Sequence, residues 1–238
     1  MLVPGDMTAT SAANKRKNPA DAALAPLWDA GLPSVVARLE GPEPEGLARA
    51  RAAVVHGDGA LDASRIWILD MTRGTRSRFA SGSDISGFPV WSPDSRYLAY
   101  TQVSDGKSRA VLRRVDGGGA PVLIHETVGA VQPESWSPDG RWLTYSARFQ
   151  GIWIVELDDD MAPVGQERQV VQSGEQGAAF GSCFIGSSDW IVYHSSEGGN
   201  FELYVAHTSD PTRRFQITSG GAIFPSWDPV SREVIYSQ

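Results

Sequence analysis

The chain has 238 residues, and its 41% hydrophobic and 21% charged content is typical of a soluble globular protein with one large domain or two small ones. Its formal net charge of −7 argues against nucleic-acid binding, which needs an excess of basic side chains to displace counterions. No apolar run approaches the length of about 18 residues that a transmembrane helix needs, so membrane insertion is not expected.

The first 64 residues differ in composition from the rest. They hold six prolines and one aromatic residue, Trp28. Apolar spacing indicates possible helices at Asp21–Asp29 and Glu45–Val55, but neither has enough large apolar side chains for a core. We predict a flexible or loosely helical extension over 1–64, with a boundary near Ala60–Arg65. A proline and an aspartate interrupt the start, so it does not resemble a signal peptide, and the chain as written is expected in the cytoplasm.

From Arg65 onward the chain changes to short segments rich in Ile, Val, Trp and Tyr, separated by Gly, Asp, Asn and Pro. Such segments are typical of β-strands bounded by turns. No segment after Arg65 offers four turns of helix, so residues 65–238 are predicted to be all-β. The clearest predicted strands are RIWILD (65–70), YLAYT (97–101), WLTYS (142–146), GIWIVEL (151–157), WIVYHS (190–195), FELYVA (201–206) and EVIYS (233–237).

These strands repeat at a regular distance. The tyrosines that end equivalent strands are separated by 45, 48 and 43 residues, and so are the aromatic residues that end the strands before them. Periods of roughly 40–50 residues with four strands each are typical of β-propeller blades. The two sets are Tyr100, Tyr145, Tyr193 and Tyr236, and Trp91, Trp136, Phe184 and Trp227.

A turn phrase follows the strand-ending aromatic residue in three of the repeats. It reads SPDS, SPDG and DPVS, in which the proline presets the turn and a Ser or Asp oxygen can cap it. Asp94 and Asp139 are therefore interpreted as turn formers and not as catalytic carboxylates. The repeat ending at Tyr193 departs from this phrase, with Phe184 and no proline. The predicted structural motif residues are Trp91, Ser92, Pro93, Asp94, Trp136, Ser137, Pro138, Asp139, Gly140, Trp227 and Pro229.

Three phrases, FPVWSPDSRYLAYT, PESWSPDGRWLTYS and FPSWDPVSREVIYS, resemble the TolB-like, or WD-repeat-like, propeller repeat. The stretch IWILDMTRGTRSRF also resembles the outer half of such a blade. Together with ELYVAHTSDPTRRFQITSGG, it is most similar to propellers appended to bacterial serine/threonine kinases. The resemblance covers about residues 65–238 and implies an all-β partial propeller of about four four-stranded blades. The best-known member of the family is periplasmic, in contrast to the expectation from the N-terminus. The repeat serves scaffolds, receptors and peptidases, so it leaves the function open.

The predicted arc is incomplete. It contains the outer half of one blade (65–80), three whole blades (86–218) and the inner half of another (222–237). TolB-like propellers usually close with roughly six blades, and an open arc leaves strand edges exposed. The chain is then a fragment of a longer protein, or its first 64 residues cover one edge, or two copies associate through open edges. We favour the first.

No catalytic, metal or cofactor site is predicted. No G-x-S-x-G motif is present, and the histidines are scattered, so His194 is best interpreted as a satisfied or solvent-facing side chain. The acidic run LDDDM (157–161) is interpreted as a solvated turn, and Cys183, the only cysteine, as a small core residue.

A binding surface is the remaining candidate for function. Propellers usually bind partners through the loops after the second strand of each blade (102–108, 147–151 and 195–200) and the loops between blades (81–87, 126–131 and 173–179). The favoured hypothesis is a non-catalytic module that binds a protein or peptide. The alternatives are the propeller of a prolyl-oligopeptidase-like serine peptidase without its hydrolase domain, and a truncated product without function. The candidate partner-binding residues are Asp105, Lys107, Arg148, Phe149, Glu197 and Asn200.

Overall fold

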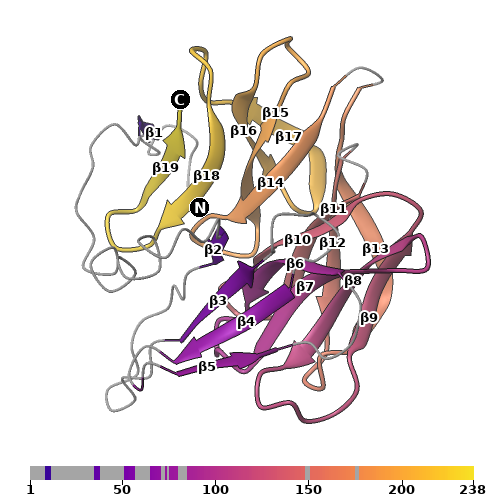
Figure 1. The fold of residues 1–238 in the computed structure, drawn as a ribbon. Helices are drawn as coiled ribbons and strands as arrows, with labels where there is room; N and C mark the ends of the chain where they lie inside the picture. The colour runs from indigo at the N-terminus through magenta and orange to yellow at the C-terminus, as the bar shows by residue number, and fades with distance from the viewer. Residues whose placement is uncertain are drawn as a thin grey trace. The chain divides into compact units, whose positions relative to one another are not determined.

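The computed structural model describes residues 9–11, 35–37, 51–56, 65–70, 73, 75–79, 85–147, 151–174 and 177–238. These residues form 19 β-strands and contain no α-helix. Sixteen of the strands lie in four antiparallel four-stranded sheets, and the other three form a smaller sheet (Figure 1). The prediction of an all-β chain with four-stranded blades is confirmed.

Each four-stranded sheet takes its strands in chain order, as a propeller blade does. Blade 1 contains β2 (Val35–Ala37), β3 (Arg51–His56), β4 (Arg65–Asp70) and β5 (Thr75–Arg78). Blade 2 contains β6 (Ile85–Trp91), β7 (Tyr97–Ser104), β8 (Lys107–Arg114) and β9 (Val122–Thr127). Blade 3 contains β10 (Val131–Trp136), β11 (Trp142–Ala147), β12 (Gly151–Leu157) and β13 (Pro163–Gln172). Blade 4 contains β14 (Ala179–Phe184), β15 (Trp190–Ser195), β16 (Glu202–His207) and β17 (Asp210–Gln216).

The smaller sheet, called the terminal sheet here, joins the two ends of the sequence. It contains β18 (Ile223–Asp228), β19 (Glu233–Ser237) and β1 (Ala9–Ser11). β19 pairs with β18 in the antiparallel direction and with β1 in the parallel direction. A segment from the first 64 residues therefore lies along the edge of β19.

The expected helix over Glu45–Val55 is wrong in its described part, because Arg51–His56 forms β3. This strand pairs with β4 along its whole length, from Arg51 opposite Asp70 to His56 opposite Arg65. Helical spacing of a few apolar residues is a weak local signal, and hydrogen bonding to a neighbouring strand overrides it. β2 and β3 also supply the first two strands of the blade of which only the outer half was expected. The other expected helix, Asp21–Asp29, lies outside the described residues, and the division of the chain near residues 60–65 stays a prediction.

The chain divides into two compact units, one of residues 16–128 and one of residues 1–15 and 129–238. The first unit contains blades 1 and 2, which share one apolar core. Burying each large apolar side chain in such a core contributes roughly 1.5–3 kcal/mol to stability. The core residues are Ile66, Ile68, Phe79, Trp91, Leu98, Tyr100 and Val111.

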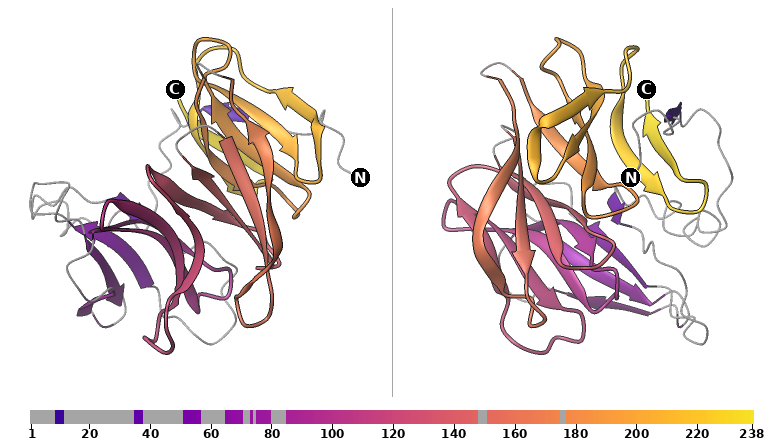
Figure 2. Two further views of the ribbon diagram at one scale, coloured as in Figure 1. Left: turned by 90° about the vertical axis from the view of Figure 1, so that its right-hand side faces the viewer. Right: turned by 180° about the vertical axis from the view of Figure 1, so that it is seen from behind.

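In the second unit, blade 4 lies between blade 3 and the terminal sheet (Figure 2), and apolar clusters cover both of its faces. Ile191 and Tyr193 of β15 pack in a cluster with residues of blade 3, such as Ile152 and Ile154. Val192, which lies between them in the strand, packs in a second cluster with Val234 and Tyr236 of the terminal sheet. Because successive residues of a strand point to opposite faces, a strand between two neighbouring sheets is continuously apolar. This burial on both faces explains the sequence WIVY.

Candidate functional site

The repeated turn phrase forms a hydrogen-bonded loop in blade 2. The Ser92 hydroxyl donates to Asp94 Oδ1 over 2.6 Å, and the backbone N–H of Tyr97 donates to Ser92 Oγ over 2.9 Å. The N–H of Arg96 donates to Asp94 Oδ1 over 3.0 Å. Ser95 has a φ of 58°, in the left-handed region that this turn requires. The serine and the aspartate thus satisfy the N–H groups that enter the second strand.

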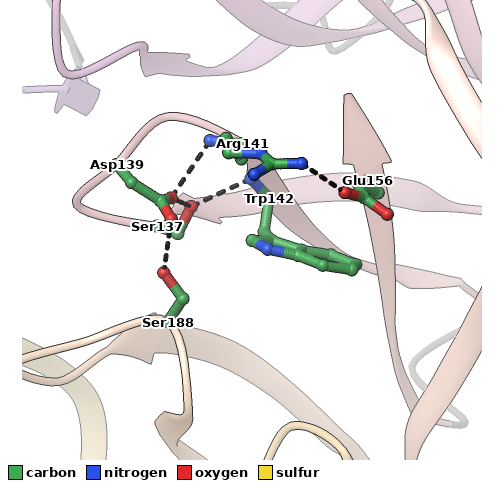
Figure 3. A network of polar contacts seen from close by, with 6 residues as sticks. All are labelled: Ser137, Asp139, Arg141, Trp142, Glu156 and Ser188. Carbon is green, nitrogen blue, oxygen red and sulfur yellow. Dashed lines mark hydrogen bonds and ion pairs between the residues drawn. The ribbon is translucent and has the colours of Figure 1, made fainter. Parts of the chain in front are cut away.

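Blade 3 repeats this geometry, and Figure 3 shows it from close by. Ser137 Oγ donates to Asp139 Oδ1 over 2.5 Å and accepts from the Trp142 N–H over 2.9 Å. Gly140 takes the left-handed position, with a φ of 73°. Ser188 of blade 4 donates to Asp139 Oδ2 over 3.0 Å, so this carboxylate also joins two blades of the same unit.

The carboxylate of Asp139 therefore accepts hydrogen bonds from groups within the fold. Burial acts to raise the pKa of Asp139, but hydrogen bonds from Ser137, Arg141 and Ser188 outweigh it and hold the pKa below its ordinary value. An ionised carboxylate whose oxygens already accept several hydrogen bonds is poorly suited to donate a proton.

Blade 4 keeps the backbone of this turn without its serine. Ile185 stands at the place of Ser137, and its N–H donates to the Trp190 carbonyl over 3.0 Å, as the N–H of Ser137 does to Trp142 over 2.8 Å. In the terminal sheet Asp228 accepts at Oδ1 from the Val230 N–H over 2.9 Å. Of the other motif residues, Trp91 and Trp136 are buried, Trp227 is half-buried, and Pro93, Pro138 and Pro229 are exposed in their turns.

The candidate loop residues that are described make contacts within the protein or lie exposed. Asp105 and Gly106, with φ values of 52° and 72°, form the two-residue turn between β7 and β8. Lys107 forms an ion pair with Glu126 over 2.5 Å, Glu197 forms one with Arg214, and Asn200 is exposed. Arg148 and Phe149 lie outside the described residues. A role of these loops in partner binding stays a prediction.

The sequence analysis missed a bulge in the first strand of blades 2, 3 and 4 and of the terminal sheet. In each case the register with the second strand shifts two to four residues before the strand-ending aromatic residue. The bulge residues Phe88, Gly181 and Phe224 have positive φ values of 52°, 67° and 53°. Glycine adopts such a conformation easily, but a bulky residue does so only under strain. Phe88 and Phe224 are also 51% and 63% exposed.

Aromatic rings surround a buried histidine at the bulge of blade 4. His194 is 1% exposed, and its ring meets those of Phe180, Phe201 and Phe224 edge to face, at centroid distances of 4.1, 5.4 and 5.5 Å. The Phe224 N–H donates to His194 Nδ1 over 3.2 Å. Burial lowers the pKa of His194 to about 4. The histidine is neutral near pH 7, is buried and not solvent-facing, and forms one hydrogen bond, at Nδ1.

The side chain of Glu134, from blade 3, accepts hydrogen bonds from the residues of the same bulge. Glu134 accepts from the Gly181 N–H over 2.7 Å, from the Ser182 N–H over 2.8 Å and from the Ser182 hydroxyl over 2.5 Å. Burial raises the pKa of Glu134, against the opposing effect of these hydrogen bonds. The bulge removes Gly181 and Ser182 from the ladder with β15, and Glu134 replaces the partners that they lose.

The described residues offer no group of three or more histidine, cysteine, aspartate or glutamate side chains that could hold a metal ion. In the same part of the chain, no helix is long and apolar enough to span a membrane. The acidic run at 157–161 is a turn in which Asp158 Oδ1 accepts from the N–H groups of Asp160 and Ala162. The geometry offers one candidate site in each unit: the exposed Phe88 at the bulge of β6, and the exposed Phe224 with the buried His194 at the bulges of β18 and β14.

Comparison with known proteins identifies the fold. No family model matches the chain. A candidate TolB of Agrobacterium tumefaciens superposes with a TM-score of 0.64 and 21% identity, over 86% of this chain and 70% of that one. TolB of Acinetobacter baumannii superposes with a TM-score of 0.62 and 16% identity, over 78% of this chain and 46% of that one. A prolyl endopeptidase superposes with a TM-score of 0.55 and 16% identity, over 74% of this chain and 29% of that one.

Two curated relatives are similar in sequence. An uncharacterized protein of Agrobacterium fabrum is 27% identical over 64% of this chain and 50% of its own length. The uncharacterized peptidase YuxL of Bacillus subtilis is 35% identical over 32% of this chain and 12% of its own length. The matched region therefore spans half or less of these relatives. Together with the four blades, the structural similarities show that residues of this chain adopt the fold of a TolB-like β-propeller.

Proposed function

We propose that the chain is a non-catalytic propeller module that recognises a protein or peptide partner. The observation that carries this proposal is the pair of exposed phenylalanines, Phe88 and Phe224, at the bulges of β6 and β18. Aromatic side chains are enriched at the centres of protein interfaces, where they contribute most of the binding energy.

The backbone of these two residues supports a role in binding. Each has a positive φ and directly precedes a proline, which further restricts the residue before it. Strain of this kind costs on the order of 1–3 kcal/mol per residue and clusters at binding sites. An exposed phenyl ring also forgoes the roughly 1.5–3 kcal/mol that burial would contribute. A bound partner that covers the rings would recover this second quantity.

Selection of binding peptides from a random phage-displayed library tests the proposal on the full chain. We expect peptides that bind saturably and lose about tenfold in affinity or more when Phe88 or Phe224 is replaced by alanine, which corresponds to about 1.4 kcal/mol. Val230→Ala is the matched control, because this apolar side chain is 92% exposed but lies in the turn after β18. A library that yields no saturable peptide, or peptides that bind both phenylalanine variants as tightly as the wild type, would refute the proposal.

The second candidate is the propeller portion of a prolyl-oligopeptidase-like peptidase. The similarity to YuxL and to a prolyl endopeptidase favours it. Sequencing of the genomic DNA on both sides of this reading frame tests this candidate. An in-frame hydrolase segment with a G-x-S-x-G motif supports it, and flanking sequence without one counts against it.

The wider context of the module is part of the proposal. The resemblance of the repeats to kinase-linked propellers supports a place in a larger sensor or envelope protein, and the same sequencing would reveal a kinase segment. The family analogy supports a periplasmic location, and fractionation of the source cells tests it.

A further inference from the structure

We propose that His194 and the phenylalanines around it form a recognition site for one residue of an extended peptide. This residue has an aromatic or large aliphatic side chain, and its neutral backbone carbonyl accepts a hydrogen bond from His194 Nε2. The side chain would pack against Phe201 and Phe224. This inference rests on the proposed function and names the site and the ligand chemistry.

The hydrogen bond at Nδ1 decides which nitrogen of His194 can serve a ligand. Because the Phe224 N–H donates to Nδ1, the proton of the neutral imidazole is on Nε2. No residue in the described part of the chain forms a hydrogen bond with Nε2. Nε2 is not among the buried side-chain atoms of the described residues that lack a hydrogen-bond partner, so this N–H reaches the surface of the cluster, where a bound acceptor can take the place of water.

The surroundings of the ring define an apolar site. Phe180 and Phe201 meet each other at a centroid distance of 5.8 Å, and Phe224, at 63% exposure, forms the accessible side of the cluster. Gly181 allows the imidazole to lie against the bulge, because a Cβ atom there would be 2.4 Å from His194 Cε1. The backbone is thus shaped to hold the histidine in this orientation.

The charges nearby favour a neutral acceptor over an anion. The carboxylate of Glu134 accepts from the N–H of Gly181, the residue against which the imidazole lies. The faces of the phenyl rings are also electronegative, and an anion would be placed next to both. A peptide carbonyl accepts a hydrogen bond from Nε2 without this repulsion.

The other blades provide an internal comparison. The residue paired with the position four before the strand-ending aromatic residue is His194 in blade 4, Thr101 in blade 2 and Ser146 in blade 3. Blade 2 also has an exposed phenylalanine, Phe88, in the same backbone conformation. Val230, which is 92% exposed in the turn after β18, is the control for Phe224.

The test is a titration of the ¹⁵N-histidine-labelled chain with N-acetyl-L-phenylalaninamide, followed by NMR at the imidazole of His194. We expect saturable shifts of the Nε2 signal, binding weakened by about tenfold in Phe224→Ala, and unchanged binding in Val230→Ala. His194→Thr, which copies blade 2, is expected to lose the binding while the chain keeps its cooperative unfolding.

Three results would overturn the inference. The first is that the His194 signal does not shift up to the solubility limit of the probe. The second is an equal shift with N-acetylglycinamide, which lacks the side chain. The third is tighter binding of phenylacetate, which is an anion. The phage selection separates the two proposals. A selected peptide that binds Phe224→Ala and His194→Thr as tightly as the wild type refutes this site and leaves the binding module standing, whereas a library without saturable binders refutes the proposed function itself.

Discussion

His194 is expected to make the protein less stable as the pH falls from 7 to 4. Its pKa is about 4 in the folded chain against an ordinary value of 6.5, so between these values the unfolded chain binds the additional proton. Protonation at Nδ1 also removes the acceptor of the Phe224 N–H. The contribution of His194 is therefore fully present above pH 6.5 and is lost as the pH falls towards 4.

The two pKa values set the size of this loss. Linkage between protonation and folding gives about 2 kcal/mol at pH 5 and about 3 kcal/mol at pH 4, relative to pH 8. Urea unfolding of the wild type and of His194→Thr at each pH measures it. The variant lacks the titrating group, so the difference between the two free energies of unfolding isolates His194 from carboxylates such as Asp139.

Parallel pH dependences of the two proteins, or an NMR titration of His194 with a pKa near 6.5, would refute this reasoning. Either result would mean that the imidazole is hydrated in the folded chain and not enclosed by the phenylalanines.

Three further substitutions test the hydrogen bonds and the backbone of the second unit by urea unfolding. Ser137→Ala removes the acceptor of the Trp142 N–H and is expected to lower the free energy of unfolding by about 1–2 kcal/mol, so an unchanged value would contradict the role assigned to the turn. Gly181→Ala places a Cβ atom 2.4 Å from His194 Cε1 and is expected to lower the free energy of unfolding by at least about 3 kcal/mol. The control Gly106→Ala, at a similar φ but with open space around it, is expected to lower it by about 1 kcal/mol. Equal losses would show that the contact is unimportant. Glu134→Ala leaves two N–H groups without their acceptor and is expected to cost about 2–4 kcal/mol, and a loss below that of Ser137→Ala would argue that water replaces the carboxylate.

The turn phrases were predictable because their chemistry is local. Ser92, Asp94, Ser137 and Asp139 bond to backbone groups within five residues of themselves, so the sequence pattern alone indicates the turn. The spacing of the tyrosines and tryptophans predicted the blades for a related reason. Each repeat must bury aromatic side chains against neighbouring sheets, and this requirement recurs at the period of the fold.

The remainder depends on contacts between distant segments. The segment of β3 was predicted as part of a helix because its strand partner, β4, begins further along the chain and no local pattern announces that pairing. The cluster around His194 draws on Phe180, Phe201 and Phe224, which no motif connects. The bulges did have a signal, since Phe-Pro precedes the tryptophan at 88–89 and 224–225, and a proline inside a strand indicates a bulge or an edge.

Hydrogen–deuterium exchange of the chain, with and without a peptide selected from the library, tests the central claim most directly. The account predicts new protection in β14 and β18, around Gly181 and Phe224, and unchanged exchange in the turn at Val230. Protection confined to segments other than β6, β14 and β18 would contradict the assignment of Phe88 and Phe224 to partner binding.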